Sequence, residues 1–201
     1  MKKKLTILVL IIGIFSIALL YSYYNYQFWK HFKTDNFEAL VEYEGNSIKG
    51  LRGRQILIHQ NFEKYMKQID KYASDSDIEL IINQGYRSDK QTVSNAVVKP
   101  VKSSNHLAGF AIDFNIKNNG KKYLSTDLER DKLDKLPDNI QHFINEIRKN
   151  KDLRWGGDFR REDPVHIDYP INIKSKSNWR EFSRACALDY SNRIPKWKVW
   201  K

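Results

Sequence analysis

Hydrophobic and polar positions divide the chain into an apolar N-terminal segment and a body of mixed pattern. Three lysines at positions 2–4 precede an uncharged run over residues 5–20, and tyrosines continue this run to residue 26. An uncharged run of this length with cations at one end is typical of a membrane-spanning helix, and the positive-inside rule keeps the lysines in the cytoplasm. The expected parts are a membrane anchor over 1–26, a stalk over 27–45 and a folded extracytoplasmic domain over 46–201.

Two alternatives compete for the N-terminal segment. A cleaved signal peptide needs small residues at alternate positions before the cut, and Leu19-Leu20-Tyr21-Ser22 offers only a poor site. A buried core helix is the other alternative, but the length of the run and its one-sided lysines argue against it. An uncleaved single-pass anchor is therefore favoured.

Periodic patterns in the body predict two helices and three strands. Apolar residues at steps of three or four positions predict helices over Gln55–Ala73 and Pro137–Lys149. A short run rich in β-branched residues predicts a strand over Ile78–Ile82, and alternating apolar and polar residues predict strands over Phe110–Ile116 and Val165–Tyr169. The order of these elements predicts an α+β fold, a small antiparallel sheet with flanking helices, preceded by one transmembrane helix.

The charge balance is strongly basic. The 201 residues include 35 Lys and Arg against 24 Asp and Glu, which gives a formal net charge of +11. A basic body outside the cell suits anionic partners such as wall polymers or lipid headgroups. No nucleic-acid partner is expected, because basic and aromatic residues do not interleave as they do in a single-strand groove. The single cysteine, Cys186, excludes an internal disulfide, and its apolar neighbours predict a buried thiol.

Residues with catalytic or metal-binding chemistry gather in three places. His106 precedes Asp113 by seven residues, and Asp113 lies on the polar face of the second predicted strand. Asp163 stands three residues before His166, at the start of the third strand. Two histidines and one carboxylate fill three positions of a tetrahedral zinc site and leave the fourth for water, and a remaining carboxylate can serve as general base. Arg87, which follows the first predicted strand, is a candidate to stabilise a developing oxyanion.

Each of these signals is weak alone, because a histidine near an aspartate is more often a simple hydrogen-bonded pair. The combination is stronger than any single pair. His31, His59 and His142 lack such neighbours and are predicted to be surface or stalk residues. A serine hydrolase is a rival enzyme class, but the sequence has no Gly-x-Ser-x-Gly elbow, and Ser104 is too close to His106 along the chain to use it as a base.

At these residues the sequence resembles a known family, the zinc D-alanyl-D-alanine carboxypeptidases and L-alanyl-D-glutamate endopeptidases. These enzymes share a hedgehog-like fold and cut bacterial peptidoglycan peptides. The resemblance runs from about Gln55 to Tyr169. The positions that carry it are Ser104, His106, Gly109, Ala111 and Asp113, then the turn Trp155–Asp158, then Asp163 with His166.

The resemblance implies a role for each site residue. His106, Asp113 and His166 are expected to bind Zn²⁺, Asp163 to act as general base, and Arg87 to polarise the scissile carbonyl.

Four further residues near the motifs are candidates for substrate contact, for the general base or for orienting a zinc ligand. Ser104 and Trp155 are expected to contact the substrate, although a place in the core is the alternative for Trp155. Glu162 is the alternative to Asp163 as the base. Asp168 either orients a zinc ligand or faces solvent.

The sequence as a whole predicts a membrane-anchored zinc metallopeptidase that hydrolyses the stem peptides of peptidoglycan. An L-Ala-D-Glu endopeptidase is favoured over a D-Ala-D-Ala carboxypeptidase. The alternative from another class is a non-catalytic, zinc-containing module that binds the cell wall and is tethered to the membrane.

Overall fold

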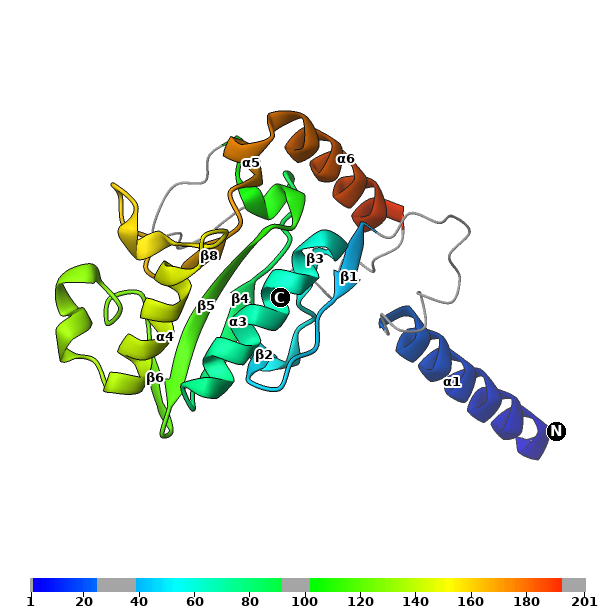
Figure 1. Cartoon of the computed structure of the whole chain (residues 1–201). Helices are drawn as coiled ribbons and strands as arrows, with labels where there is room; N and C mark the ends of the chain where they lie inside the picture. Colours follow the sequence, from blue (N-terminus) through cyan, green and yellow to red (C-terminus); the bar gives the residue numbers. More distant parts are fainter. Residues whose placement is uncertain (1, 25–38, 92–101, 193–201) are drawn as a thin grey trace.

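The computed structural model describes residues 2–24, 39–91 and 102–192, and Figure 1 draws them as helices and strands. The first element is the helix α1 (Lys2–Tyr24). Within it, the 19 residues Lys3–Tyr21 have a mean hydropathy of 2.4, and none of this stretch is buried. At 1.5 Å per residue the stretch is about 28 Å long, close to the thickness of the hydrocarbon core of a bilayer. This helix is therefore a candidate membrane span, and a signal sequence has the same character.

The body is built on a six-stranded sheet in the order β2-β4-β5-β8-β7, with β6 paired to the C-terminal end of β5. β2 and β4 run parallel, and the other pairs are antiparallel. The α+β fold is confirmed, and the predicted antiparallel sheet differs only in this one parallel pair. The strands span Ile48–Gly50 (β2), Glu79–Gln84 (β4), Ala111–Asn118 (β5), Lys121–Tyr123 (β6), Arg154–Trp155 (β7) and His166–Asp168 (β8).

Two helices, α3 (Glu63–Asp75) and α4 (Asp138–Lys149), lie side by side across one face of this sheet (Figure 1). Each helix buries a stripe of apolar residues at steps of three or four. The rings of Phe114 on β5 and Phe143 on α4 meet edge to face, with their centroids 6.1 Å apart. The buried residues between this face and the two helices form the hydrophobic core. Burying one phenylalanine side chain there contributes about 1.5–3 kcal/mol to stability.

Alternation along β5 separates the core from a polar face. Ile112, Phe114 and Ile116 are fully buried, whereas Asp113 between them is partly exposed. Successive side chains of a strand point to opposite faces, so a residue directly opposite Asp113 on the next strand points the same way as Asp113. His166 of β8 occupies that position in the register. The sheet therefore carries this polar pair on the face opposite α3 and α4.

The first strand of the body lies where a stalk was predicted. β1 (Leu40–Glu42) pairs antiparallel with β3 (Leu57–His59), and Leu40 is fully buried. The predicted stalk therefore extends too far, because residues 39–45 belong to the folded body. The rest of that stalk, residues 27–38, lies outside the described residues.

The first helix of the body is shorter than predicted. The sequence pattern predicted a helix from Gln55, whereas α3 begins at Glu63. The intervening chain forms β3 and the 3-10 turn η2 (Gln60–Phe62). Pairing with β1 satisfies the backbone groups of β3 and so overrides the helical spacing of Ile58.

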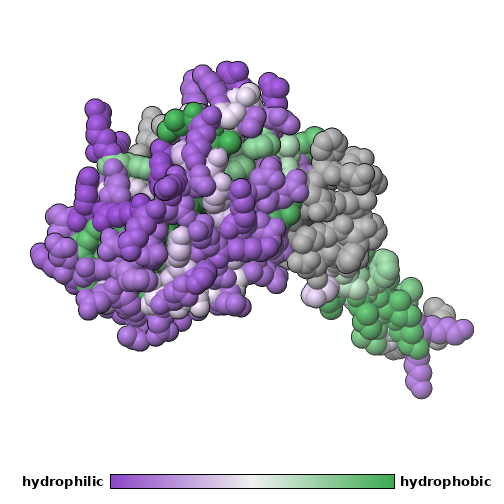
Figure 2. Space-filling view, viewed as in Figure 1, coloured by the Kyte–Doolittle hydropathy of each residue, from purple (hydrophilic) through white to green (hydrophobic). Residues whose placement is uncertain are grey.

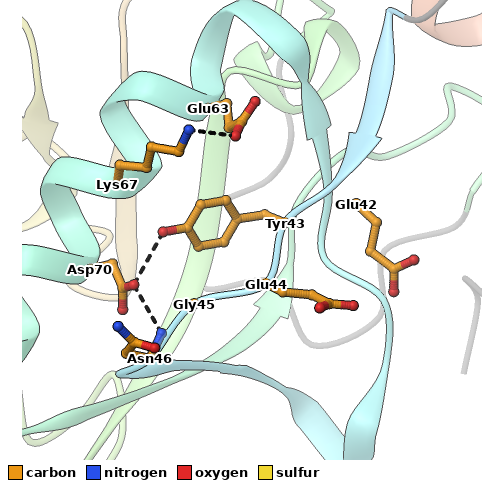
Figure 3. Close-up of a pocket in the computed structure, with 8 residues that line it drawn as sticks. All are labelled: Glu42, Tyr43, Glu44, Gly45, Asn46, Glu63, Lys67 and Asp70. Atoms are coloured by element: carbon orange, nitrogen blue, oxygen red, sulfur yellow. Dashed lines mark hydrogen bonds and ion pairs between the residues drawn. The ribbon is translucent and has the colours of Figure 1, made fainter.

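Asp70 of α3 holds the connection between β1 and β2 against the helix (Figure 3). Its carboxylate accepts hydrogen bonds from the Tyr43 hydroxyl at 3.2 Å and from the backbone N–H groups of Asn46 and Ser47 at 3.0 and 2.8 Å. The approach is so close that a Cβ atom on Gly45 would lie 2.8 Å from Asp70 Oδ2. The carboxylate of Asp70 therefore stabilises the connection between β1 and β2 through its hydrogen bonds.

Two helices that the sequence analysis did not predict close the body. α5 (Ile171–Lys174) leads into α6 (Lys176–Asn192), which packs on the 3-10 turn η3 (Asn105–Ala108) (Figure 1). The Cys186 thiol is fully buried and contacts a carbonyl oxygen of η3 at 3.5 Å, which confirms the predicted buried thiol. α6 thereby supports the turn that carries His106. The remaining 3-10 turns span Leu51–Gly53 (η1), Arg130–Lys135 (η4) and Gly156–Asp158 (η5).

Candidate metal centre and active site

Three side chains from three different elements converge on the polar face of the sheet. They are His106 from η3, Asp113 from β5 and His166 from β8. His106 Nε2 and His166 Nδ1 lie 3.1 and 2.9 Å from Asp113 Oδ1 and 3.2 Å from each other. All of these ligand-type atoms lie within 4.8 Å of one another. The structure thus brings together the three residues that were predicted to bind a metal ion.

Contacts on the outer side of each imidazole orient the two rings. The Nδ1–H group of His106 donates to the Gly85 carbonyl oxygen at 2.7 Å, which leaves Nε2 available as a ligand. On His166 the roles are exchanged, because Nδ1 faces the cluster and Nε2 lies 3.6 Å from Asp168 Oδ2. Outer contacts of this kind fix the orientation of histidines that bind metals. Two imidazole nitrogens and one carboxylate oxygen, supported in this way, fit the donor set of a catalytic zinc site.

Asp168 is a buried carboxylate next to His166. It is 2% exposed and accepts two hydrogen bonds from the Arg154 guanidinium, at 2.9 and 2.7 Å. Asn105 Nδ2 donates a third, at 2.7 Å. Burial raises the pKa of Asp168, but the hydrogen bonds from His166 and Arg154 outweigh burial and hold that pKa well below its usual range. The solvent-facing alternative for Asp168 is therefore wrong.

Arg154 and Asn105 were not singled out from the sequence. A signal existed for Arg154, because it directly precedes the Trp155–Asp158 turn, and pairing of that segment with the third predicted strand places it opposite Asp168. No local pattern marks Asn105 except its place directly before His106.

The charges of the cluster are strongly coupled. Burial raises the pKa of Asp113, but the neighbouring His106 and His166 outweigh burial and hold that pKa well below its usual range. Burial lowers the pKa of His166, but its contacts with Asp113 and Asp168 outweigh burial and raise that pKa to about 10. These contacts favour the protonated form of His166 in the metal-free protein, and a metal ion bound at Nδ1 would displace this proton.

Asp163 is coupled to the cluster, and Glu162 is not. Burial raises the pKa of Asp163, and the negative charge of Asp113 raises it further, while His166 opposes these effects. Glu162 instead accepts hydrogen bonds from the backbone and guanidinium of Arg130, at 3.0 and 2.9 Å, and these bonds lower its pKa. These couplings favour Asp163 over Glu162 as the carboxylate that interacts with the cluster.

The Gly-Gly pair after β7 permits the close approach of Asp163 and His166. The Asp163 N–H donates to the Gly156 carbonyl oxygen at 2.9 Å, and the Asp163 carbonyl accepts from the His166 N–H at 3.0 Å. A Cβ atom on Gly156 would lie 2.3 Å from that Asp163 carbonyl oxygen and 2.9 Å from His166 Cβ. A Cβ atom on Gly157 would lie 2.2 Å from the ring of Trp155. A larger residue at Gly156 would therefore displace Asp163 and His166, and one at Gly157 would displace the Trp155 ring.

Arg87 is a buried cation beside the cluster. It is 7% exposed, and its backbone N–H donates to the His106 carbonyl oxygen at 3.1 Å. Burial lowers the pKa of Arg87, and the carboxylate of Asp113 counteracts this effect. Within the described part of the chain, its guanidinium has no hydrogen-bond or ion-pair partner. A largely desolvated guanidinium without such a partner is suited to hold a developing negative charge.

The two predicted substrate contacts have different surroundings. Trp155 is 2% exposed, its Nε1–H donates to the Pro164 carbonyl oxygen at 2.8 Å, and the Arg148 guanidinium lies 4.7 Å from its ring. The prediction that Trp155 lines the substrate groove does not fit this burial, since the indole completes the core beneath the turn. Ser104 is half-buried at the start of η3, and its carbonyl oxygen accepts from Trp179 Nε1 at 3.1 Å.

His59 and His142, the other histidines of the described residues, do not belong to the cluster. His59 is 3% exposed and packs between Phe110 and Phe182, with ring centroids 5.0 and 4.4 Å away, so its predicted place on the surface or stalk is wrong. Burial lowers the pKa of His59 to about 4. His142 is exposed, as predicted, and His31 lies outside the described residues.

Comparison with known families agrees with this geometry. Residues 98–169 match the model of a family described as D-alanyl-D-alanine carboxypeptidase. The matched segment contains His106, Asp113, Asp163 and His166, and no curated protein matches the chain. The match supports a peptidase, and a His-Asp-His cluster that could hold a metal ion lies inside the matched segment. The resemblance that the motifs predicted is therefore confirmed over residues 98–169, the segment that matches this peptidase family.

Proposed function

We propose that this chain is a membrane-anchored zinc peptidase that hydrolyses the stem peptides of peptidoglycan. The observation that carries the proposal is the convergence of His106, Asp113 and His166 within 4.8 Å, inside the segment that matches the peptidase family. An extracytoplasmic domain held by an N-terminal helix meets this polymer directly. The net charge of +11 also suits anionic wall polymers.

The three converging atoms are the proposed zinc ligands. His106 Nε2, Asp113 Oδ1 and His166 Nδ1 would hold the ion and leave one position open. Zinc bound there would supply a Lewis acid that lowers the pKa of a coordinated water to about 7. Gly85 and Asp168 would keep the two imidazole rings in place, since each contacts the outer nitrogen of one ring.

Asp163 is the proposed general base and Arg87 the proposed oxyanion partner. Asp163 accepts a proton from the attacking water and returns it to the amine that leaves when the C–N bond breaks. Burial and the charge of Asp113 raise the pKa of Asp163, which makes this carboxylate a better proton acceptor. The Arg87 guanidinium compensates the negative charge that develops on the carbonyl oxygen, because it is buried next to the cluster.

Among the bonds of the stem peptide we favour the one between L-Ala and D-Glu over the terminal D-Ala-D-Ala bond. The support is the compact spacing of the motif from Ser104 to Asp113, which resembles the endopeptidase branch. Ser104 is the proposed substrate contact, since it is partly exposed and stands two residues before His106.

Mass spectrometry of defined stem peptides tests this function. The full-length chain in detergent is incubated with stem tetrapeptides and pentapeptides, with added zinc or with a chelator. We expect chelator-sensitive cleavage, and a fragment that begins with D-Glu identifies the endopeptidase. Loss of one terminal alanine would instead identify the carboxypeptidase.

Two variants separate catalysis from binding in the same experiment. Asp163→Asn should abolish cleavage while the protein retains zinc, and Glu162→Gln, which changes the adjacent carboxylate, should cleave normally. A folded, zinc-loaded wild-type chain that binds stem peptides without cutting them would overturn the enzyme and support the non-catalytic wall-binding module.

A further inference from the structure

One pocket of the described residues is lined by the sequence neighbours of Arg87 and His106 and by none of the proposed metal ligands. It has a volume of about 340 Å³ and lies between α6 and the chain segments next to Arg87 and His106. We call it the α6 pocket. Its lining includes the aromatic and apolar residues Tyr86, Leu107 and Trp179 and the cations Lys102, Arg180 and Arg184.

The α6 pocket is cationic. Arg180 and Arg184 are four residues apart on α6, so their side chains share one face of the helix, and Lys102 adds a third positive charge against one carboxylate, Asp89. All three cations are exposed, and among residues 2–24, 39–91 and 102–192 none of them has an ion-pair partner. Guanidinium groups at one concave site bind carboxylates well, because two N–H groups of one Arg pair with both carboxylate oxygens.

The chain connects this pocket directly to the proposed catalytic residues. Tyr86 precedes Arg87, Leu107 follows His106, and the Arg87 backbone N–H donates to the His106 carbonyl oxygen at 3.1 Å. Trp179 adds a second link, since its Nε1–H donates at 3.1 Å to the carbonyl oxygen of Ser104, which directly precedes η3. The pocket and the proposed catalytic residues therefore share the same two chain segments.

We propose that the α6 pocket binds a carboxylate of the stem peptide at a position away from the scissile bond. This inference rests on the proposed function. A stem peptide presents carboxylates next to small apolar groups, and the pocket presents cations next to Leu107, Trp179 and Ala187. A volume of about 340 Å³ is at the small end of ligand pockets, which suits one or two residues of a peptide better than a repeating phosphate polymer.

Binding measurements with two forms of one stem peptide test this proposal. One form has free carboxylates, and in the other they are amidated. The full-length chain carries Asp163→Asn to prevent turnover, is loaded with zinc, and is titrated calorimetrically. Adding Arg180→Glu with Arg184→Glu should weaken binding of the free acid about tenfold or more and leave the amidated form unchanged. Lys121→Glu with Lys122→Glu, an exposed basic pair on β6, is the matched control and should change neither.

The outcomes separate this proposal from the proposed function. Equal affinities of wild type and the arginine variant for the free acid would overturn the α6 pocket as a carboxylate site. So would arginine-dependent binding of a short polyglycerol phosphate with no effect on the stem peptide. Arginine-dependent binding of a stem that wild type never cuts would support the pocket and overturn the peptidase. Arg180→Gln with Arg184→Gln repeats the test if charge reversal prevents folding.

Discussion

Arg154 and Asp168 lie directly opposite each other on β7 and β8 and share two hydrogen bonds, of 2.9 and 2.7 Å. Asp168 also lies 3.6 Å from His166 Nε2, so the guanidinium acts on the metal centre through one carboxylate. Without its cationic partner, burial would favour the protonated form of Asp168 and weaken its contact with the imidazole. Arg154 is therefore a positioning residue for a proposed metal ligand.

Replacing Arg154 should weaken zinc binding without removing any ligand. We expect Arg154→Ala to lower zinc affinity by about 10- to 100-fold, the usual effect of losing outer support of a metal-bound histidine. Competition with a chromogenic chelator measures this affinity. Arg148→Ala is the matched control, since Arg148 makes a similar pair with Asp158, at 2.9 and 2.6 Å, and neither residue contacts a proposed ligand. Equal affinities of the two variants would show that zinc binding does not depend on Arg154.

Replacing Arg87 should slow the reaction and spare the metal. Removing one contact to an oxyanion costs about 2.7–4 kcal/mol, so Arg87→Ala should lose roughly a hundredfold or more in kcat. Its zinc content should match that of wild type, because Arg87 supplies no ligand. Arg87→Lys keeps the charge but not the guanidinium geometry, and its kcat should lie between those of wild type and Arg87→Ala. Full activity of a folded Arg87→Ala would remove this residue from the mechanism.

Replacing Asp163 should abolish proton transfer. General acid–base catalysis contributes typically 10²- to 10⁴-fold, so Asp163→Asn should lose about that much in kcat while zinc remains bound. Glu162→Gln should lose little, because Glu162 pairs with Arg130 instead of facing the cluster. Single-turnover hydrolysis of a stem peptide measures both. If Glu162→Gln is the inactive variant, the two adjacent carboxylates exchange roles.

His59 should make the domain less stable in mild acid. Its pKa is about 4 in the fold against 6.5 for an exposed histidine, so between these pH values the unfolded chain binds more protons than the folded one. The contribution of neutral His59 is therefore complete above pH 6.5 and is lost as the pH falls toward 4, by about 2–3 kcal/mol.

Urea unfolding at several pH values between 4 and 7 tests this linkage. The His59→Gln variant should be less stable than wild type at pH 7, because it loses the ring contacts of His59 with Phe110 and Phe182. Its stability should also fall less steeply toward pH 4. His142→Gln, at an exposed position, should follow the wild-type slope. Parallel slopes for wild type and His59→Gln would contradict the linkage.

The sequence predicts the parts of the fold whose signals are local. β4, β5, β8 and α4 follow from alternation or helical periodicity, and the three clustered residues follow from motif spacing and resemblance. β1 and β3 are three residues long each and exist through pairing with each other, which no local pattern reveals.

The contacts that support the cluster also escaped prediction, for a different reason. Arg154 meets Asp168 across a strand pair, and Trp179 meets the start of η3 from a helix far along the chain. His59 was predicted to be exposed because histidine is polar. Its burial depends on the rings of Phe110 and Phe182, which the fold brings to it from other parts of the chain.

The hydrogen bond of 2.9 Å between the Leu40 backbone and the Asp189 carboxylate joins the beginning of the body to its end. A chain that crosses the membrane behind an N-terminal helix delivers Leu40 first and Asp189 last. The turn that carries His106 packs on the same terminal helix, α6. In the proposed extracytoplasmic orientation, translocation and folding are therefore coupled in order: the domain closes, and the turn with His106 gains its support from α6, only after α6 has emerged. An export intermediate stalled before α6 should remain an open, protease-sensitive chain on the outer side of the membrane.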